Sequence, residues 1–508
     1  MHLCRVMPSL CFVVPPLLAS CYAAILRLYQ HGWRTLPEWK LPEGFTPTLG
    51  VSILIPARNE AHNIGLCLQS ILDNHYPPHL LEILVVDDHS TDETGAVVRQ
   101  IQAALTQKGH PSLLRLLCLA EYGVEGKKMA LTQAVRQATM PLVLTTDADC
   151  VVGRAWIWGW VAAFDPTPNS SPGGEGGLPT TIAWDGLESV RNGMGDKYGA
   201  QGLGDLPTTQ VWDGLESVRN GMGGKSDARG GGNLPTTIAW DGSKDLAKVL
   251  GKNNDLKKTV SLLPDEDRSS PKPPSPPGEG LGVGSVLFLP NPSLLQQFQA
   301  LDFIGLMGIT GAGIHLGFQR MGNGANMAYR KTVFEAVGGY TGNENIASGD
   351  DLFLIQKVEK RFPGSVFFLK SRETAVWTAA EPNWRAFWRQ RVRWGAKNAA
   401  LPEWPVRLVL LAVFLFCWSI VLTGVWLAWA LVFSARFPYG LLGLWLGQLA
   451  VKAWADWLFL REICRFFDRM ELMRRFWPSF ALHTLYIAVV GLAGLCYKKY
   501  EWKGRRTR

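Results

Sequence analysis

The sequence is poor in charge for its length and lacks several patterns that would assign it to common protein classes. Charged residues make up 19% of its 508 residues, against roughly 25% in an average soluble domain. Its nine cysteines are scattered, and no C-x-x-C or Cys/His spacing predicts a disulfide framework or a zinc site. No G-x-G-x-x-G follows the first expected strand, so a dinucleotide cofactor is not expected.

Apolar and aromatic residues are abundant instead. Hydrophobic residues account for 47% of the chain, and there are 21 tryptophans. This composition excludes a disordered or collagen-like chain and argues against a purely soluble protein. The net charge of +8 fits an anionic membrane surface or a phosphorylated substrate. We expect no nucleic-acid partner, because the basic residues cluster beside apolar runs.

Four apolar stretches are candidates for membrane spans, each near the length that crosses a bilayer. They are Val6 to Leu26, Leu408 to Phe433, Tyr439 to Leu460 and Phe480 to Tyr497. A cleaved signal peptide is the alternative for the first stretch. We expect a transmembrane anchor in residues 1–29, a linker in 30–50, and a membrane region with about three spans in 401–508.

Basic residues predict how these spans are oriented. The loop between the last two stretches carries five arginines, so the positive-inside rule places it and the preceding soluble region in the cytosol. The expected location is the cell inner membrane. The basic tail after Tyr497 conflicts with this scheme, unless the last stretch is re-entrant. Within the third stretch, Lys452 and Asp456 are four residues apart. We expect a neutralised pair, with an intramembrane functional pair as the alternative.

The segment 165–283 differs from its surroundings. It contains 22 Gly and 12 Pro among 119 residues, a low-complexity composition. The sequence LPTTIAWDGLESVRNGMG starts at Leu178, returns at Leu206 with 16 of 18 residues identical, and begins again at Leu234. Such near-identical copies with few core residues do not fit a solenoid. We interpret the segment as a disordered surface insert.

The remaining soluble region alternates strand and helix patterns. Strands are expected at 51–56, 84–86, 113–119 and 142–146, and helices at 59–73 and 128–138, with Ser90 or Thr91 capping the helix after the second strand. This order predicts an α/β fold with a doubly wound, mostly parallel sheet. In such a sheet, ligands bind at the carboxyl ends of the strands.

Acidic residues lie at those ends. Asp87 and Asp88 end one strand, and Asp147 and Asp149 end another. Each could simply be a turn residue that accepts local backbone hydrogen bonds. Two clusters at one edge favour a site instead, because carboxylate oxygens at that place suit Mg²⁺ or Mn²⁺ and a diphosphate.

Two further patterns follow later in the chain. Asp350 and Asp351 precede a helical pattern that Ser348 could cap, and their simpler role is to complement the helix N-terminus. Residues 384–394 form an amphipathic helix that includes Gln390, Arg393 and Trp394. A helix lying on the membrane surface is the alternative interpretation.

The order of these motifs resembles the family 2 glycosyltransferases of GT-A fold, in the membrane-anchored branch with the cellulose, hyaluronan and chitin synthases. The resemblance covers residues 50–400 without the insert. The matching pieces are VSILIPARNE (51–60), VVDDHSTD (85–92), GKKMAL (126–131), TTDAD (145–149), GNGANMAY (322–329), SGDDL (348–352) and QRVRW (390–394).

The resemblance implies a role for each matching residue. Asp88, supported by Asp87, would contact the base or ribose of the nucleotide-sugar, and Lys127 would approach the nucleotide. Asp147 and Asp149 would form the metal-binding D-x-D, with Asp149 the direct ligand. Asp351 would be the catalytic base and Asp350 its acidic neighbour. Gln390, Arg393 and Trp394 would lie near the acceptor and the diphosphate.

We therefore predict a membrane-anchored, inverting glycosyltransferase with its catalytic domain in residues 51–400. It would use a divalent metal ion and a UDP- or GDP-sugar, with a lipid-linked or saccharide acceptor. A single carboxylate base with no carboxylate nucleophile implies inversion. A processive polysaccharide synthase, a nucleotidyltransferase and an inactive membrane scaffold are the alternatives.

Overall fold

The computed structural model describes the backbone of residues 3–42, 44–165, 280–342, 349–398, 404–434, 436–496, 500–502 and 505–507. These residues belong to one unit of the chain, 1–184 with 274–508. Most of the predicted insert, and Ser348 with its predicted capping role, lie outside the described residues. The interpretation of the insert as a disordered surface segment therefore stays a prediction.

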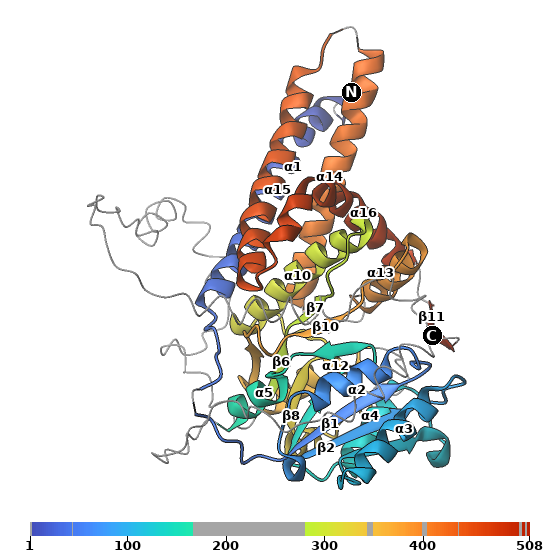
Figure 1. Cartoon of the computed structure of the whole chain (residues 1–508). Helices are drawn as coiled ribbons and strands as arrows, with labels where there is room; N and C mark the ends of the chain where they lie inside the picture. Colours follow the sequence, from blue (N-terminus) through green and yellow to red (C-terminus); the bar gives the residue numbers. More distant parts are fainter. Residues whose placement is uncertain are drawn as a thin grey trace, which may run out of the picture. The chain divides into compact units, whose positions relative to one another are not determined.

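The core of the unit is a seven-stranded sheet with the order β3-β2-β1-β4-β8-β6-β9. Figure 1 shows β1 and β2 side by side in this sheet. Strands β1 to β4 pair in parallel, and β8 runs antiparallel to both of its neighbours. This confirms the predicted mostly parallel α/β fold. The strand bounds are β1 (Val51–Ala57), β2 (Leu81–Asp87), β3 (Leu114–Cys118), β4 (Leu142–Thr145), β6 (Leu281–Gly284), β8 (Met327–Arg330) and β9 (Val366–Leu369).

The register of the parallel strands brings their carboxyl ends to one edge. Ala57, the last residue of β1, pairs with Asp87, the last residue of β2. The residues of both strands are buried almost throughout, as expected where helices cover both faces of a parallel sheet. The connecting helices are α2 (Ile64–Leu72), α3 (Thr94–Gln107) and α4 (Lys127–Gln137).

The capping prediction for α3 was wrong. Helix α3 begins at Thr94, and Asp92 accepts hydrogen bonds from the backbone N–H and the hydroxyl of Thr94. Ser90 and Thr91 contact the neighbouring loop instead, through Asn59.

The predicted end of the insert also differs from the structure. Leu281, Gly282 and Val283 lie in β6, a fully buried strand between β8 and β9. A Cβ atom at Gly282 would lie 2.4 Å from the ring of Trp160. A glycine in this segment is thus required by close packing, which composition alone cannot distinguish from low complexity.

A second, three-stranded sheet has the order β5-β10-β7, from β5 (Cys150–Val152), β10 (Val376–Thr378) and β7 (Val286–Phe288). Beside it, the buried amide of Asn326 accepts hydrogen bonds from the indole N–H groups of Trp156 and Trp160 in α5 (Trp156–Phe164). The same amide donates to the carbonyls of Ser285 and Thr374. One side chain therefore satisfies four buried polar groups from three chain segments.

The rest of the unit is mainly helical. Helix α1 (Leu3–Thr35) packs against α10 (Leu294–His315), α14 (Trp404–Phe433) and α15 (Tyr439–Phe466), and α13 (Trp384–Asn398) packs against α16 (Phe476–Cys496). Helix α10 was not among the predicted elements. The remaining elements include α11 (Lys331–Ala336), α12 (Asp350–Arg361), the short helix η4 (Met470–Arg475), and the hairpin of β11 (Tyr500–Trp502) and β12 (Arg505–Thr507).

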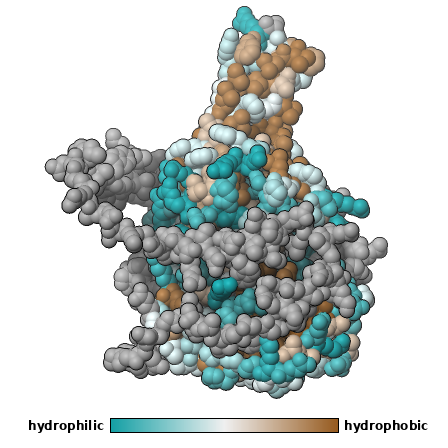
Figure 2. Space-filling model, viewed as in Figure 1, coloured by the Kyte–Doolittle hydropathy of each residue, from teal (hydrophilic) through white to brown (hydrophobic). Residues whose placement is uncertain are grey.

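Two helices among the described residues are long and apolar enough to cross a membrane, Phe12–Thr35 and Trp404–Phe433. Exposed apolar side chains cover much of α14, for example Val425, Trp429 and Phe433, and Figure 2 shows apolar atoms dominating the surface where α14 and α15 project. The predicted spans in α15 and α16 do not appear among these helices. In α15, Lys452 and Asp456 are buried against other helices and pair with each other, as predicted.

Candidate active site

Two loops at the carboxyl edge of the sheet hold each other. After β1, the side-chain carbonyl of Asn59 accepts a hydrogen bond from Thr91 N, and Asn59 N donates to Ser90 Oγ. Glu60 N donates to the hydroxyl of Thr94. The pKa of Asp92 lies below its ordinary value, because hydrogen bonds from Thr94 and Ala61 outweigh the opposing effect of burial. The loops after β1 and β2 thus form one rigid wall.

Asp88 lies in this wall and lines the cavity described below. Its Oδ1 accepts a hydrogen bond from Gly126 N, before α4, and lies 3.8 Å from the Arg58 guanidinium. Asp87 does not line the cavity, and its carboxylate accepts a hydrogen bond from Ser90 N in the turn. The support predicted for Asp87 therefore takes the form of a local turn contact.

The two carboxylates of the D-x-D follow β4. Asp147 Oδ1 accepts a hydrogen bond of 2.5 Å from Lys127 Nζ at the start of α4. Asp149 is exposed and lines the same cavity. Within the part of the chain that the structure describes, no three His, Cys, Asp or Glu side chains gather into a metal ligand set of their own.

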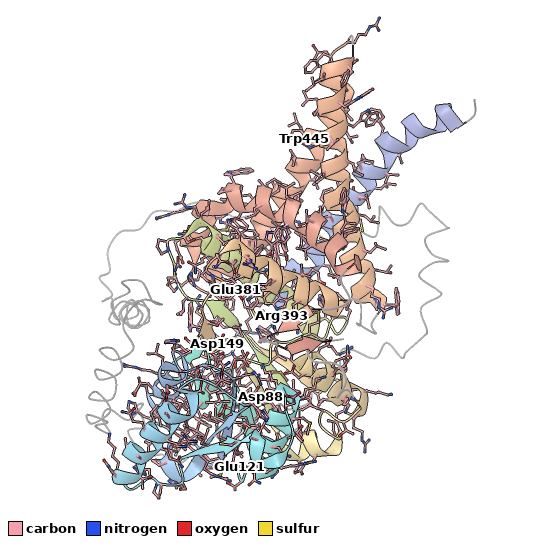
Figure 3. All side chains as sticks on the ribbon, turned by 90° about the vertical axis from the view of Figure 1, so that its right-hand side faces the viewer. Asp88, Glu121, Asp149, Glu381, Arg393 and Trp445 are labelled. Carbon is pink, nitrogen blue, oxygen red and sulfur yellow. The ribbon has the colours of Figure 1, made fainter. Side chains whose placement is uncertain are left out.

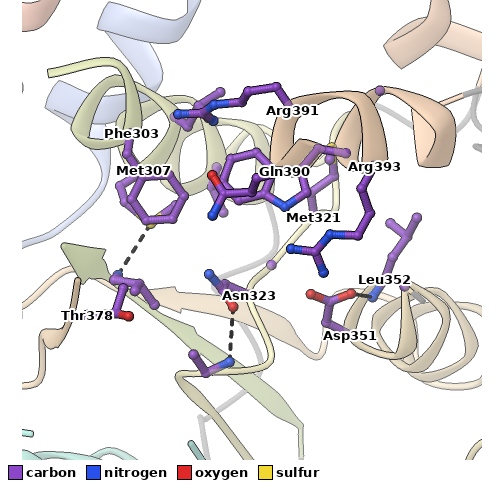
Figure 4. A pocket seen from close by; sticks show the side chains of 18 of the residues that line it. Phe303, Met307, Met321, Asn323, Asp351, Leu352, Thr378, Gln390, Arg391 and Arg393 are labelled. Carbon is purple, nitrogen blue, oxygen red and sulfur yellow. Dashed lines mark hydrogen bonds between the residues drawn. The ribbon is translucent and has the colours of Figure 1, made fainter. Parts of the chain in front are cut away.

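Asp350 and Asp351 begin α12, after Gly349 in a left-handed conformation with φ of 88°. Lys127 Nζ lies 3.9 Å from Asp350 Oδ2, so one ammonium group joins the acidic pair of α12 to the D-x-D. Asp351 accepts hydrogen bonds from Leu352 N and Gly324 N. Asp351 and Leu352 face the cavity, and Arg393 extends toward Asp351 (Figure 4).

The opposite wall is helix α13. Gln390, Arg393 and Trp394 line the cavity. Gln390 Nε2 donates a 2.9 Å hydrogen bond to Glu381 Oε1 in the loop before the helix. Figure 3 shows Asp88 and Asp149 on the side of the sheet layer that faces Arg393 and Glu381, whereas Glu121 lies at the far end of that layer.

One cavity of about 1130 Å³ joins these walls. Its polar part contains Asp88, Lys127, the D-x-D and the acidic pair of α12. It continues between helices along apolar side chains of α10, α14 and α16, among them Met307, Leu410, Val413, Phe414, Ile487 and Val490. The cavity therefore offers an ionic end and an apolar end to a ligand.

The electrostatics of the ionic end are set by close pairs. Burial lowers the pKa of Lys127, but Asp147 and Asp350 outweigh it, so the pKa lies above its ordinary value and the group stays charged. Burial also raises the pKa of the thiols of Cys67 and Cys150, with Asp149 adding to the effect. These thiols are neutral and are poor candidates for nucleophiles.

Nine of the ten predicted site residues line this one cavity, and Asp87 is the exception. Sequence reasoning missed Arg58, Glu381, Arg391 and Arg407, which also line the cavity. Arg58 and Arg391 stand inside quoted motifs and could have been found there. Glu381 and Arg407 had no signal, because only folding brings their segments to the site.

Comparisons with known proteins find glycosyltransferases among the similar sequences. Residues 52–174 match the family model described as glycosyl transferase family 2. Over 124 residues, 24% of the chain, the sequence is 31% identical to the glycosyltransferase AglE of Haloferax volcanii, covering 38% of that protein. Over 104 residues, 20% of the chain, it is 30% identical to the beta-monoglucosyldiacylglycerol synthase of Synechocystis, covering 20% of that protein. The matches thus span well under half of each relative.

A solved structure, the mannosyltransferase PcManGT from Pyrobaculum calidifontis in complex with GDP-Man and Mn²⁺, is 17% identical with a TM-score of 0.45. That likeness covers 94% of this chain and 99% of the other. The family model covers the two wall-forming loops, α4 and the D-x-D. Residues 52–174 of this chain are thus similar to glycosyl transferase family 2.

Proposed function

We propose that this protein is a membrane-anchored, inverting glycosyltransferase that moves a sugar from a nucleotide-sugar to a lipid acceptor. One observation carries the proposal. The D-x-D, Lys127 and the acidic pair of α12 converge at the ionic end of a cavity whose other end is apolar. A charged donor and an amphipathic acceptor can meet in such a cavity at the carboxylate Asp351.

The donor would occupy the ionic end. Asp88 and Arg58, which line the cavity, would contact the base and ribose of a UDP- or GDP-sugar, and Lys127 and Arg393 would supply positive charge for the diphosphate. Positive groups aimed at a leaving diphosphate stabilise the charge that develops there. The carboxylates of Asp147 and Asp350 would hold Lys127 in place until a charged ligand competes for its ammonium group.

The carboxylates of the D-x-D fit a divalent metal ion. They are hard oxygen donors on the cavity wall, and Mg²⁺ or Mn²⁺ usually takes one or two carboxylates with diphosphate oxygens completing its shell. Asp149 would be the direct ligand, supported by Asp147. Such an ion would neutralise charge on the diphosphate.

Asp351 would act as the general base. Its carboxylate faces the cavity at the N-terminus of α12, where the helix dipole favours the ionised form. It would take the proton of the acceptor hydroxyl as that oxygen attacks the anomeric carbon, and the bond to the nucleoside diphosphate would break. With one base and no carboxylate nucleophile, the displacement would invert the anomeric configuration.

The apolar end favours a lipid as acceptor. Leu410, Val413, Phe414, Ile487 and Val490 line it, and they come from α14 and α16. One relative in the comparisons is named as a synthase of a glycosylated diacylglycerol. A polymer of sugars would bring many hydroxyl groups against this mainly apolar stretch, and unsatisfied hydroxyls are costly to bury there. This disfavours the processive alternative.

The basic loop supports a cytosolic site. Arg469 donates a hydrogen bond to the Phe288 carbonyl in β7, and Arg475 donates to Gln297 in α10. The arginine-rich loop therefore contacts the elements next to the site, and the positive-inside rule would put that side in the cytosol. This orientation fits a cell inner membrane.

The proposal is tested by incubating purified membranes with a panel of UDP- and GDP-sugars and analysing the products by mass spectrometry. A lipid that gains one or a few sugars supports it, and Asp351→Asn membranes serve as the matched control. A long soluble or extruded polymer would favour the processive synthase. Absence of any sugar product across the panel would favour the inactive scaffold.

A further inference from the structure

A row of buried charges connects α13 with the helices packed around it. Asp302 in α10 places its Oδ2 2.9 Å from Nη2 of Arg391 in α13. The side chain of Arg391 is 1% exposed and that of Asp302 is 6% exposed. The guanidinium carbon of Arg391 lies 4.3 Å from the ring centroid of Trp394, and Phe387 and Tyr486 lie close by. Arg391 is thus held by one carboxylate and three aromatic rings.

The row continues from Asp302 into the other helices. His483 Nε2 in α16 lies 3.8 Å from Asp302 Oδ1, and Lys452 Nζ in α15 lies 3.3 Å from His483 Nδ1. Lysine can only donate, so Nδ1 accepts and the ring proton sits on Nε2, facing Asp302. Lys452 also contacts Asp456 Oδ2 at 2.5 Å, and Asp456 accepts from the Tyr22 hydroxyl in α1. Five helices therefore share one row of charges.

A second contact from α10 holds the same part of the site. Gln299 lies one turn before Asp302 and is fully buried. Its amide donates to the Glu381 carbonyl and accepts from Glu381 N. The side chain of Glu381 in turn accepts from Gln390. One face of α10 thus fixes two consecutive residues of α13, Gln390 through Glu381 and Arg391 through Asp302.

Stability alone is a weak reason for such a row. Buried ion pairs often contribute little to folding compared with apolar residues of the same volume, although removing one partner is costly. The contacts do fix a geometry, because Arg391 stands between Gln390 and Arg393 on α13. A shift of α13 would move Arg393 and Trp394 relative to Asp351, and displacement by about 1 Å can cost on the order of a hundredfold in rate.

We propose that Asp302 is a positioning residue for glycosyl transfer, which sets α13 against Asp351 through its ion pair with Arg391. His483 and Lys452 support Asp302 from α16 and α15. Turnover therefore depends on the packing of helices that carry no reacting group. This inference rests on the proposed function. One readout of its test, the hydrogen exchange of α13, does not depend on glycosyl transfer.

The test compares Asp302→Asn and Asp302→Glu in the full-length protein in detergent. Asp302→Asn removes the charge and keeps the size, whereas Asp302→Glu keeps the charge. For Asp302→Asn we expect turnover to fall about 10- to 100-fold, with the KM for the donor and the affinity for UDP or GDP within about twofold. Hydrogen exchange should become faster in residues 384–398. Asp302→Glu should recover part of the turnover and of the exchange protection.

Two further variants sharpen the result. Arg391→Gln should resemble Asp302→Asn, and the double variant should be no worse than either single one, because both remove the same contact. Glu462→Gln is the control. It removes the ion pair between Glu462 in α15 and Arg34 in α1, which does not involve α13. It should leave turnover and α13 exchange unchanged.

Normal turnover with normal α13 exchange in Asp302→Asn would overturn the proposal, even if the melting temperature falls. Equal losses in Asp302→Asn and Asp302→Glu, with faster exchange throughout the chain, would also overturn it in favour of a purely structural role. If the wild-type protein transfers no sugar from any donor, the proposed function fails. The exchange of residues 384–398 then still decides whether Asp302 positions α13.

Discussion

At the scale of single residues, a small number of paired side chains carry the charge of the site. Lys127 contacts Asp147 and lies near Asp350, and Asp351 takes two backbone hydrogen bonds from Leu352 and Gly324. Each carboxylate therefore has a structural partner before any substrate arrives. A substitution that tests the chemistry must therefore keep the structural contacts of the carboxylate and remove only its basicity.

Asp351→Asn makes that separation, because it keeps the size of the side chain and removes its basicity. We expect near-normal affinity for the nucleotide and a loss of at least about a hundredfold in turnover, the low end of what a general base contributes. If Asp351 only complemented the helix N-terminus, the variant would lose roughly 0.3–1 kcal/mol of stability and keep its turnover. Nucleotide affinity, melting temperature and rate on one variant distinguish the two.

Asp149→Ala tests the metal. We expect it to abolish transfer and leave folding intact, because Asp149 is exposed and its loss leaves no buried cavity. Treatment of the wild-type protein with EDTA should have the same effect, and Mn²⁺ or Mg²⁺ should reverse it. Glu121→Ala, an exposed acid at the far end of the sheet layer (Figure 3), is the matched control. Full activity in EDTA would exclude a metal requirement.

At the scale of elements, α10 is the helix on which the site is assembled. It contacts α1, α15, α16, β7 and β9. Three glycines make close approach possible: a Cβ atom would lie 2.8 Å from Leu460 at Gly305, 2.7 Å from Ile463 at Gly308, and 2.9 Å from Trp33 and Phe368 at Gly311. These glycines recur at helical spacing on faces that meet other helices.

Gly308→Leu should therefore separate α10 from α15. The neighbours Ile463 and Phe459 are buried and have little room to move, so we expect a loss of about 1–3 kcal/mol, typical of overpacking. Thermal unfolding in detergent measures it. Gly447→Leu on α15 is the control, because nothing lies within 4 Å of a Cβ atom there. Equal melting temperatures for the two variants would contradict the packing argument.

At the scale of the whole molecule, the chain combines a sheet domain and a set of long apolar helices, and a repetitive segment interrupts the sequence of the sheet domain. The strands on either side of that segment belong to one sheet: β4 and β6 both pair with β8. The sheet must therefore close across whatever the segment contains. The two ends of the segment are therefore more important for folding than its interior.

Two deletions test this directly. Removing residues 171–275 leaves α5 and β6 with short linkers, and we expect a cooperative melt and turnover close to that of the full chain. Removing residues 165–283 deletes β6 and the Asp165 carboxylate that accepts a hydrogen bond from Thr48, so this variant should fail to fold. Loss of folding in the shorter deletion would show that the segment packs as a domain.

Much of the fold and of the site was determined by local sequence. Short apolar runs predict β1, β2 and β4. The acids that follow β2 and β4 place Asp88, Asp147 and Asp149 at one edge, because parallel strands align their carboxyl ends. The pairing of Lys452 with Asp456 follows from helical spacing. Only the tertiary structure decided the rest. Contacts between residues that are distant in sequence decide helix α10, β6, the Asp302–Arg391 pair and the part of Glu381 in the site. The periodicity of a sequence does not indicate which distant side chains will form a buried ion pair.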